Sequence, residues 1–324
     1  MKKHFKKLLL MALMAVMAVG LIACGTDKSD NESTKEEKTS VTITSLDASK
    51  NEIELEVPYN PKRIAILDLA CLDIIDELGV GDRVVGMAST SIDYLEKYSN
   101  DASIKNLGTI KEADLEAVME CEPDIIFIGG RLSKSYDALS EIAPVVYLAT
   151  DTNEGLVNSV SKNAKTIASI FGMEDKVDSL MSDFGARIDT IKKISSGKTA
   201  LVGMTTSGSF NLLGNDGRCS LIGVEAGFNN LTAAGSTSTH GNESSFETVV
   251  QQNPDYIFVM DRDSAISTAG AKTAKEIVEN ELVKTTDAYK NNHIIYLEHS
   301  NVWYTAEGGI QALDIMLTDL EKGL

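Results

Sequence analysis

Two stretches of the chain repeat one pattern at a constant distance, and this repeat limits the folds that the chain can adopt. Residues 115–131, LEAVMECEPDIIFIGGR, align without a gap on residues 246–262, FETVVQQNPDYIFVMDR. Each copy has a helical stretch, a Pro-Asp turn, an apolar run typical of a buried strand, and an arginine directly after that run. Self-similarity on this scale indicates repeated architecture. We therefore expect two related lobes, each carrying one copy.

Further apolar runs suggest how each lobe is built. They alternate with amphipathic stretches and are bounded by turn residues, as is typical of parallel strands buried between helices. The expected strands are residues 63–68, 84–88, 125–129 and 145–148 in the first half, and 200–204, 256–260 and 294–297 in the second. The sequence thus predicts an α/β fold of two Rossmann-like lobes with mostly parallel sheets.

The domain boundaries follow from the same patterns. We expect an N-terminal lobe over residues 41–171 and a C-terminal lobe over residues 196–324. Between them, residues 172–195 carry apolar side chains at three- and four-residue steps, namely Val177, Leu180, Met181, Phe184, Ile188 and Ile191. This spacing predicts a single long amphipathic helix that joins the lobes.

The N-terminus has the features of an export signal. Residues 1–23 combine four lysines with an apolar core, and they end in LIA before Cys24. The LIAC motif resembles the lipobox of bacterial lipoproteins, whose cysteine is lipidated after cleavage. Residues 24–40 continue, after Cys24, with no aliphatic or aromatic side chain, which predicts a flexible tether. We expect a lipid-anchored protein at the extracytoplasmic face of the cell membrane.

The charge balance constrains the partners. Without residues 1–23 the chain has 26 basic and 48 acidic residues, a net charge of −22. Such a surface repels nucleic acid, so an anionic ligand requires a local basic pocket. Once Cys24 is assigned to lipid, three widely spaced cysteines remain, Cys71, Cys121 and Cys219, and we interpret them as buried free thiols.

The chain has six arginines against 24 lysines, and three of the arginines fall at positions expected to face a cleft. Arg131 and Arg262 follow the strands of the two repeats, where open parallel sheets bind their ligands. Arg218 follows the apolar run FNLL through a Gly-Asn-Asp-Gly turn, which predicts a rim loop. A guanidinium can donate two parallel hydrogen bonds to an oxyanion, so this choice of residue indicates a polyanionic ligand.

Other classes of function have less support. The sequence lacks GxSxG, HExxH and phosphate-loop motifs, so we expect no enzyme. Bare Zn or Mn binding is disfavoured because only His240, His293 and His299 remain after the signal, without the usual ligand spacing. His240 lies in a polar loop, STSTHGNESSF, and Tyr304 lies in SNVWYTAEGG, which we expect to be a loop after the last strand.

The chain resembles bacterial ABC-transporter substrate-binding lipoproteins for iron-siderophore complexes. STHG, VMDR, and VWY followed by GG are similar to motifs of the catecholate-siderophore binders, including the petrobactin type. The resemblance covers residues 41–324 and implies the class III periplasmic-binding-protein fold. It implies that Arg131, Arg218 and Arg262 receive an anionic ferric catecholate. It also implies that His240 and Tyr304 complete the coordination of Fe(III), carried as a siderophore complex rather than as an intrinsic cofactor.

The same resemblance gives a role to two glutamates of the repeats. Glu116 and Glu247 each lie seven residues before the Pro-Asp proline, and we expect the pair to dock onto the membrane permease of an ABC importer with its ATPase. The alternative is that the two glutamates only face solvent in the first turn of a helix, where a negative charge is favourable and glutamate is equally expected.

We expect a monomer. A hydroxamate siderophore, haem or a cobalamin remains the alternative ligand, and Glu307, close to the expected anion site, departs from the family pattern.

Overall fold

The computed structural model describes residues 38–234 and 237–324. The signal peptide predicted for residues 1–23, the lipidated Cys24 and most of the tether therefore lie outside the described residues. The described chain from Lys38 to Leu324 forms one compact unit. Its first strand, β1 (Ser40–Leu46), begins at the last residue of the predicted tether and pairs in antiparallel fashion with β2 (Glu52–Pro58), a hairpin that the sequence patterns did not reveal.

The N-terminal half contains a parallel sheet in the order β5-β4-β3-β8-β9. The central strands β3 and β8 are buried at every position, which explains their unbroken apolar sequences. The strands are β3 (Ile64–Ile66), β4 (Val84–Met87), β5 (Lys105–Asn106), β8 (Ile125–Ile128) and β9 (Val145–Tyr147). Beside them stand the short hairpin of β6 (Gly108–Thr109) and β7 (Glu112–Ala113) and the helices α1 (Leu69–Glu77), α2 (Glu96–Ser99), α3 (Leu115–Glu120), α4 (Tyr136–Ser140) and α5 (Leu156–Phe171).

The C-terminal half contains a second sheet in the order β11-β10-β13-β14. The pairs β10–β13 and β13–β14 are parallel, whereas β11 is an antiparallel edge strand. The expected architecture of two mostly parallel α/β sheets is therefore confirmed. The strands are β10 (Thr199–Thr206), β11 (Ser209–Leu212), β12 (Asn229–Asn230), β13 (Tyr256–Asp261) and β14 (Ile294–Tyr296), and the helices are α8 (Phe246–Gln252), α9 (Arg262–Ala265), α10 (Ala274–Val278), α11 (Asp287–Lys290), α12 (Ser300–Thr305) and α13 (Ile310–Gly323).

The sequence repeat corresponds to a repeated structural unit. α3 leads through a Pro-Asp turn into β8, and α8 leads through the matching turn into β13. Each Pro-Asp aspartate ties its strand to a neighbour. Asp124 Oδ2 accepts hydrogen bonds from the backbone N–H groups of Lys62 and Arg63, ahead of β3, and Asp255 Oδ2 accepts one from the backbone N–H of Thr199 in β10. In both halves the aspartate of the Pro-Asp turn thus accepts hydrogen bonds from backbone N–H groups at the start of the neighbouring strand.

The segment between the lobes differs from the prediction of one long helix. Residues 172–195 form two helices, α6 (Glu174–Leu180) and α7 (Phe184–Ser195), separated by Met181–Asp183. The apolar spacing remains helical through the break because Val177, Phe184 and Ile188 are buried in one core, so periodicity alone could not locate it.

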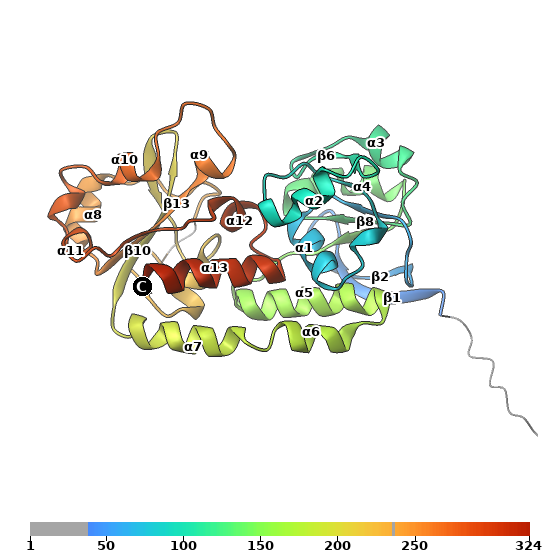
Figure 1. Cartoon of the computed structure of the whole chain (residues 1–324), viewed down its shortest axis with the longest axis horizontal. Helices are drawn as coiled ribbons and strands as arrows, with labels where there is room; N and C mark the ends of the chain where they lie inside the picture. The colour runs from blue at the N-terminus through green and yellow to red at the C-terminus, as the bar shows by residue number, and fades with distance from the viewer. Residues whose placement is uncertain (1–37, 235–236) are drawn as a thin grey trace, which may run out of the picture. The chain divides into compact units, whose positions relative to one another are not determined.

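The last helix, α13, connects both halves. It packs against α1 and α5 of the N-terminal half as well as against α7 and α12, and Figure 1 shows it alongside α5 and α7. Its N-terminus is capped from the first half of the chain: the buried carboxylate of Asp73 in α1 accepts hydrogen bonds from the backbone N–H groups of residues 310, 311 and 312 at 2.7–2.9 Å. Conversely, Glu225 of the C-terminal half accepts a hydrogen bond from the backbone N–H of Val157, at the start of α5 in the N-terminal half. The two halves are thus linked by more than the connecting helices.

The three cysteines after residue 38 are buried free thiols, as predicted. None of the helices formed by the described residues is long and apolar enough to cross a membrane.

Candidate functional site

A pocket of about 210 Å³, open to solvent, lies between the two halves; we call it the cleft pocket. Its walls come from the carboxyl ends of strands of the first sheet and from the loop and helix that follow β11 and β14. Its polar lining residues are Asp68, Arg131, Thr150, Asn163, Arg218, Tyr304, Thr305 and Glu307. The position agrees with the rule that open parallel sheets bind ligands at their carboxyl edge.

Arg131 is placed by the glycines that precede it. β8 ends at Ile128, and Gly129 passes so close to Asp68 that an added Cβ would stand 2.1 Å from its Oδ2 atom. A side chain at Gly129 would therefore displace either the strand end or Asp68. Arg131 follows in a short 3-10 helix and donates a hydrogen bond from Nη2 to the backbone oxygen of Tyr304 at 2.8 Å. This hydrogen bond joins the N-terminal and C-terminal halves of the chain across the cleft pocket.

Tyr304 lies at the centre of the predicted arginine cluster. The guanidinium carbons of Arg131, Arg218 and Arg262 lie 5.6, 4.5 and 5.6 Å from the centroid of its ring. Arg262 Nε also donates to the Tyr304 hydroxyl at 3.1 Å. The structure thus brings together three arginines that are separated by up to 131 positions. Tyr304 is in the short helix α12 and is buried, so the prediction that it lies in a loop was wrong.

Hydrogen bonds link the loop of His240 to Arg218 and to strand β11. Arg218 Nη1 donates to the backbone oxygen of Thr239 at 2.8 Å, and Asn211 Nδ2 donates to the backbone oxygen of His240 at 2.9 Å. These bonds fasten the polar loop beside the arginine. Neither His240 nor Arg262 is among the residues that line the cleft pocket. Arg262 is linked to the lining through its hydrogen bond to Tyr304, and the charges of Arg262 and Arg218 act on the imidazole of His240.

The accumulated positive charge changes the ionisation of its neighbours. Burial and then the charges of Arg262 and Arg218 lower the pKa of His240, which favours the neutral imidazole. Burial raises the pKa of Tyr304, but the hydrogen bond from Arg262 and the charge of Arg218 outweigh it, so the pKa is lowered overall. Burial and the charge of Arg218 lower the pKa of Arg131. An anion in the cleft pocket would relieve this crowding of cations.

Two charged groups of the site were not found by sequence reasoning. Lys111, in the turn between β6 and β7, lowers the pKa of both His240 and Tyr304, so its charge reaches the cluster from the other half of the chain. Asp68, the N-cap of α1, accepts from the N–H of Cys71 and lies close enough to Arg131 to interact with its charge. Neither residue belongs to a motif; Asp68 follows a strand, a weak signal that occurs at many other positions.

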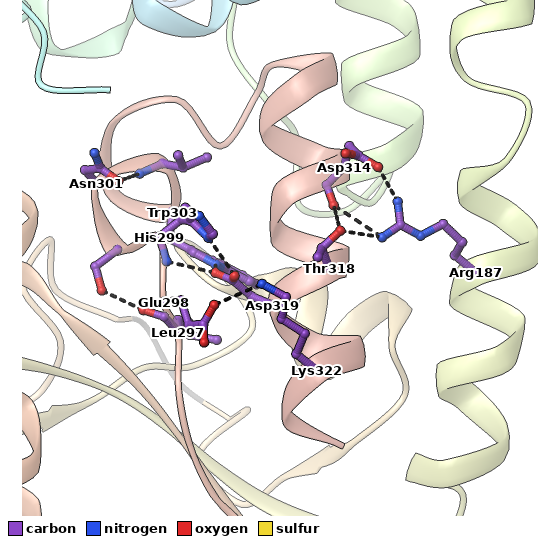
Figure 2. A network of polar contacts seen from close by, with 12 residues as sticks. Arg187, Leu297, Glu298, His299, Asn301, Trp303, Asp314, Thr318, Asp319 and Lys322 are labelled. Carbon is purple, nitrogen blue, oxygen red and sulfur yellow. Dashed lines mark hydrogen bonds and ion pairs between the residues drawn. The ribbon is translucent and has the colours of Figure 1, made fainter. Parts of the chain in front are cut away.

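A polar network fixes the helix that carries Tyr304 (Figure 2). The carboxylate of Asp319 in α13 is buried and accepts hydrogen bonds from Trp303 Nε1, from the backbone N–H of His299 and from His299 Nδ1, at 3.0, 3.0 and 2.7 Å. α13 is itself joined to α7, because Arg187 donates to Asp314, Thr318 and Glu321. The orientation of α12 therefore depends on two other helices.

Glu298, His299 and Asp319 offer ligand atoms within 4.8 Å of one another, the spacing of a metal site. The oxygens of Asp319 already accept from three N–H groups, and Glu298 forms an ion pair with Lys322 at 3.1 Å. These contacts satisfy the group without a cation, so we interpret it as a structural anchor. The sequence offers His299 no partner at the usual metal-ligand spacing, and only the fold shows Asp319 beside it.

Glu116 and Glu247 occupy matching positions in the first turns of α3 and α8, and both are exposed. Asp114 and Ser245, two residues earlier, cap the two helices by accepting from the N–H groups of Ala117 and Thr248. The symmetry expected from the repeat is therefore present in the local structure. Leu115 and Met119, on either side of Glu116, are exposed as well.

A pocket between two α/β halves, lined here by Arg131 and Arg218, is the arrangement of a solute-binding protein. The chain belongs to the periplasmic binding protein family, which its residues 64–300 match.

The chain is 36% identical to the petrobactin-binding protein YclQ of Bacillus subtilis (strain 168), over 98% of this chain and 99% of the relative. The crystal structure of that protein superposes with a TM-score of 0.80, 35% identity and coverage of 88% of this chain and 98% of the other. The periplasmic catecholate-siderophore binding protein VctP of Vibrio cholerae gives a TM-score of 0.78 at 30% identity, covering 87% and 100%. The ferric-anguibactin-binding protein FatB of Vibrio anguillarum is 26% identical over 82% of this chain and 84% of the relative. The resemblance inferred from sequence is confirmed, as is the fold class.

Proposed function

We propose that the chain is a lipid-anchored, monomeric and non-catalytic receptor of an ABC importer, which captures an anionic ferric catecholate siderophore in the cleft pocket. The observation that carries this proposal is the convergence of Arg131, Arg218 and Arg262 on Tyr304. A ferric catecholate is a large anion with oxygen atoms on its surface, and guanidinium groups are suited to it by charge and geometry. The names of two relatives, which specify petrobactin and a catecholate siderophore, support the same class of ligand.

The protein could also supply ligands to the iron. Fe(III) prefers six hard donors, and a siderophore that provides four oxygens leaves two positions open. Tyr304 has a lowered pKa, which favours the phenolate, and the lowered pKa of His240 favours the neutral imidazole that binds metals. Arg262 donates a hydrogen bond to the Tyr304 hydroxyl, so coordination of iron by Tyr304 requires that this bond be exchanged for the metal.

A titration tests the proposed ligand. Trp303 is next to Tyr304 and is the only tryptophan of the chain, so quenching of its fluorescence reports a ferric catecholate in the cleft pocket. We expect ferric petrobactin to bind at micromolar concentration or below. No quenching by ferric petrobactin or by a ferric bis-catecholate would refute the proposal.

Charge-removal variants test how the ligand is held. Each arginine contact with an anion contributes about 1.5–3 kcal/mol, so Arg218→Ala with Arg262→Ala should weaken binding at least about 100-fold. The matched control, Lys165→Ala with Lys290→Ala, removes two exposed cations that do not line the cleft pocket and should retain the affinity. A neutral ferric hydroxamate should lose much less affinity than the catecholate. Equal losses for both would instead favour a ligand held without charge recognition.

Delivery to the permease is assigned to Glu116 and Glu247. Both are exposed, one in each half, and a permease with two-fold symmetry could contact both. Glu116→Lys with Glu247→Lys should abolish uptake of radioactive iron by cells while the purified protein still binds its ligand. Normal uptake by the double variant would contradict the docking role.

Anchoring is assigned to Cys24, which lies outside the described residues. Cys24→Ser should release the protein from the membrane fraction into the medium or the periplasm. A membrane-bound Cys24→Ser protein would contradict a lipid anchor.

A further inference from the structure

Glu307 places a carboxyl group in the cleft pocket, which we propose binds an anion. Its Oε1 atom accepts a hydrogen bond from the backbone N–H of Cys219 at 2.9 Å. It lines the cleft pocket together with Arg131 and Arg218, and it also lines a neighbouring pocket. As a carboxylate, it neutralises part of the positive charge that an incoming anion would use.

We propose that Glu307 is a proton-coupled counter-charge to Arg131 and Arg218 in the cleft pocket, and that its carboxylate takes up a proton from solvent when an anionic ligand binds. The O–H bond forms on the carboxyl group of Glu307, and no other bond changes. This inference rests on the proposed function, because it requires that an anion enter the cleft pocket.

The surroundings of Glu307 determine the direction of this coupling. The cations facing it, Arg218 and Arg131, favour the carboxylate, whereas an added anion would offset them and favour the neutral acid. The neutral acid can keep the hydrogen bond from the Cys219 N–H to Oε1, because the proton can reside on the other oxygen, Oε2. The other titratable groups that act on Glu307 or line the same two pockets are Glu225, the thiols of Cys219 and Cys71, Asp68, Asp151 and Tyr304.

The ionisation of the ligand-free protein lies in a range where such coupling can be measured. Burial, opposed by the Cys219 N–H bond and the charge of Arg218, raises the pKa of Glu307 to about 7. Both the neutral acid and the carboxylate are therefore populated near neutral pH, and the proton uptake that accompanies binding should increase as the pH rises through this range.

The sign of the pH dependence follows. The neutral acid is the form that accepts the anion, so affinity is greatest below about pH 7 and decreases as the pH rises through that value. One coupled proton lowers affinity by at most about 10-fold per pH unit.

Calorimetry can measure this directly with ferric petrobactin as the probe. Titrations at pH 7 and pH 8 in two buffers with different ionisation enthalpies give the number of protons taken up. Glu307→Gln keeps an oxygen for the Cys219 N–H and mimics the neutral acid. We expect this variant to equal the wild type at pH 6, to bind up to about 10-fold more tightly at pH 8, and to lose the Glu307 share of proton uptake.

Two control variants separate Glu307 from other acids and from the chemistry of the ligand. Glu298→Gln removes an exposed carboxylate outside the cleft pocket and should keep the wild-type pH dependence. Glu225→Gln should keep most of it. If Glu307→Gln shows the wild-type uptake, or if Glu225→Gln abolishes it, the inference is overturned.

Failure of the proposed function would look different, because no variant would then give heat or quenching with ferric petrobactin or a ferric bis-catecholate. In that case the coupling inference is also refuted. Infrared difference spectra of ligand-free wild type against Glu307→Gln provide an independent readout. They should show a protonated-carboxyl band that disappears with a midpoint near pH 7. Absence of this band overturns the inference even where the ligand binds.

Discussion

The bond between Trp303 and Asp319 gives a sharp test of how the site is held. Trp303 is fully buried, and its Nε1–H donates to Asp319, which is buried as well. In Asp319→Asn, the side chain keeps its shape but loses its charge and offers an amide group in place of one acceptor oxygen. At least one of the three N–H donors around it must then lose its partner.

The expected cost can be worked out from these donors. An unsatisfied buried N–H costs about 1–3 kcal/mol, and a hydrogen bond to a charged group contributes about 1.5–3 kcal/mol. The imidazole of His299 is 43% exposed, so water replaces part of what it loses, whereas the Trp303 indole has no access to water. We expect Asp319→Asn to lower the free energy of unfolding by about 2–4 kcal/mol.

A double-mutant cycle isolates the pair. Trp303→Phe removes the indole N–H, so the penalty of Asp319→Asn should be about 1–3 kcal/mol smaller in that background. Urea unfolding followed by circular dichroism measures all four proteins without relying on tryptophan fluorescence. A coupling energy near zero, or a single-variant loss below about 0.5 kcal/mol, would refute the reasoning.

Two further predictions concern helix capping and the repeat. Asp73→Ala leaves three N–H groups at the start of α13 without their acceptor, and should lower the free energy of unfolding by about 2–4 kcal/mol in urea titrations; an unchanged midpoint would contradict the capping role. The N–H bond from Thr199 lowers the pKa of Asp255, so its stabilising effect is present above the unfolded pKa of about 3.9 and is lost as the pH falls through the lowered folded value. Asp255→Asn should therefore flatten the acid side of the stability profile, and an unchanged profile below about pH 4 would show that this carboxylate is not linked to folding.

Part of the site could be predicted from the sequence because the information was local. The repeat places Arg131 and Arg262 after matching strands, and in a parallel sheet the end of a strand determines on which edge the next residue lies. Arg218 was found in the same way, from an apolar run and a turn. His240 and Tyr304 were singled out by resemblance, and the structure brings Tyr304 into contact with the arginines.

Other parts depend on contacts between distant segments, and no local pattern encodes them. The break in the linking helix left no trace because both pieces face the same core. Lys111, Asp68 and Asp319 act on residues that are far from them in the sequence. The identity of α12 as a helix was missed because its six residues are too few to show a helical period.

The sequence by itself therefore determined the two-lobed α/β architecture and the strand ends that carry the arginines, and it led to the prediction of an anionic ligand. Periodicity, turn chemistry and charge are properties of neighbouring residues, and they survive without a fold. Only the tertiary structure decided that three arginines meet over one tyrosine ring, that Asp73 of the first half caps the last helix, and that Glu307 faces Arg218 and Arg131. These relations depend on how the two halves pack, because each joins residues whose separation in the chain gives no indication of their distance in space.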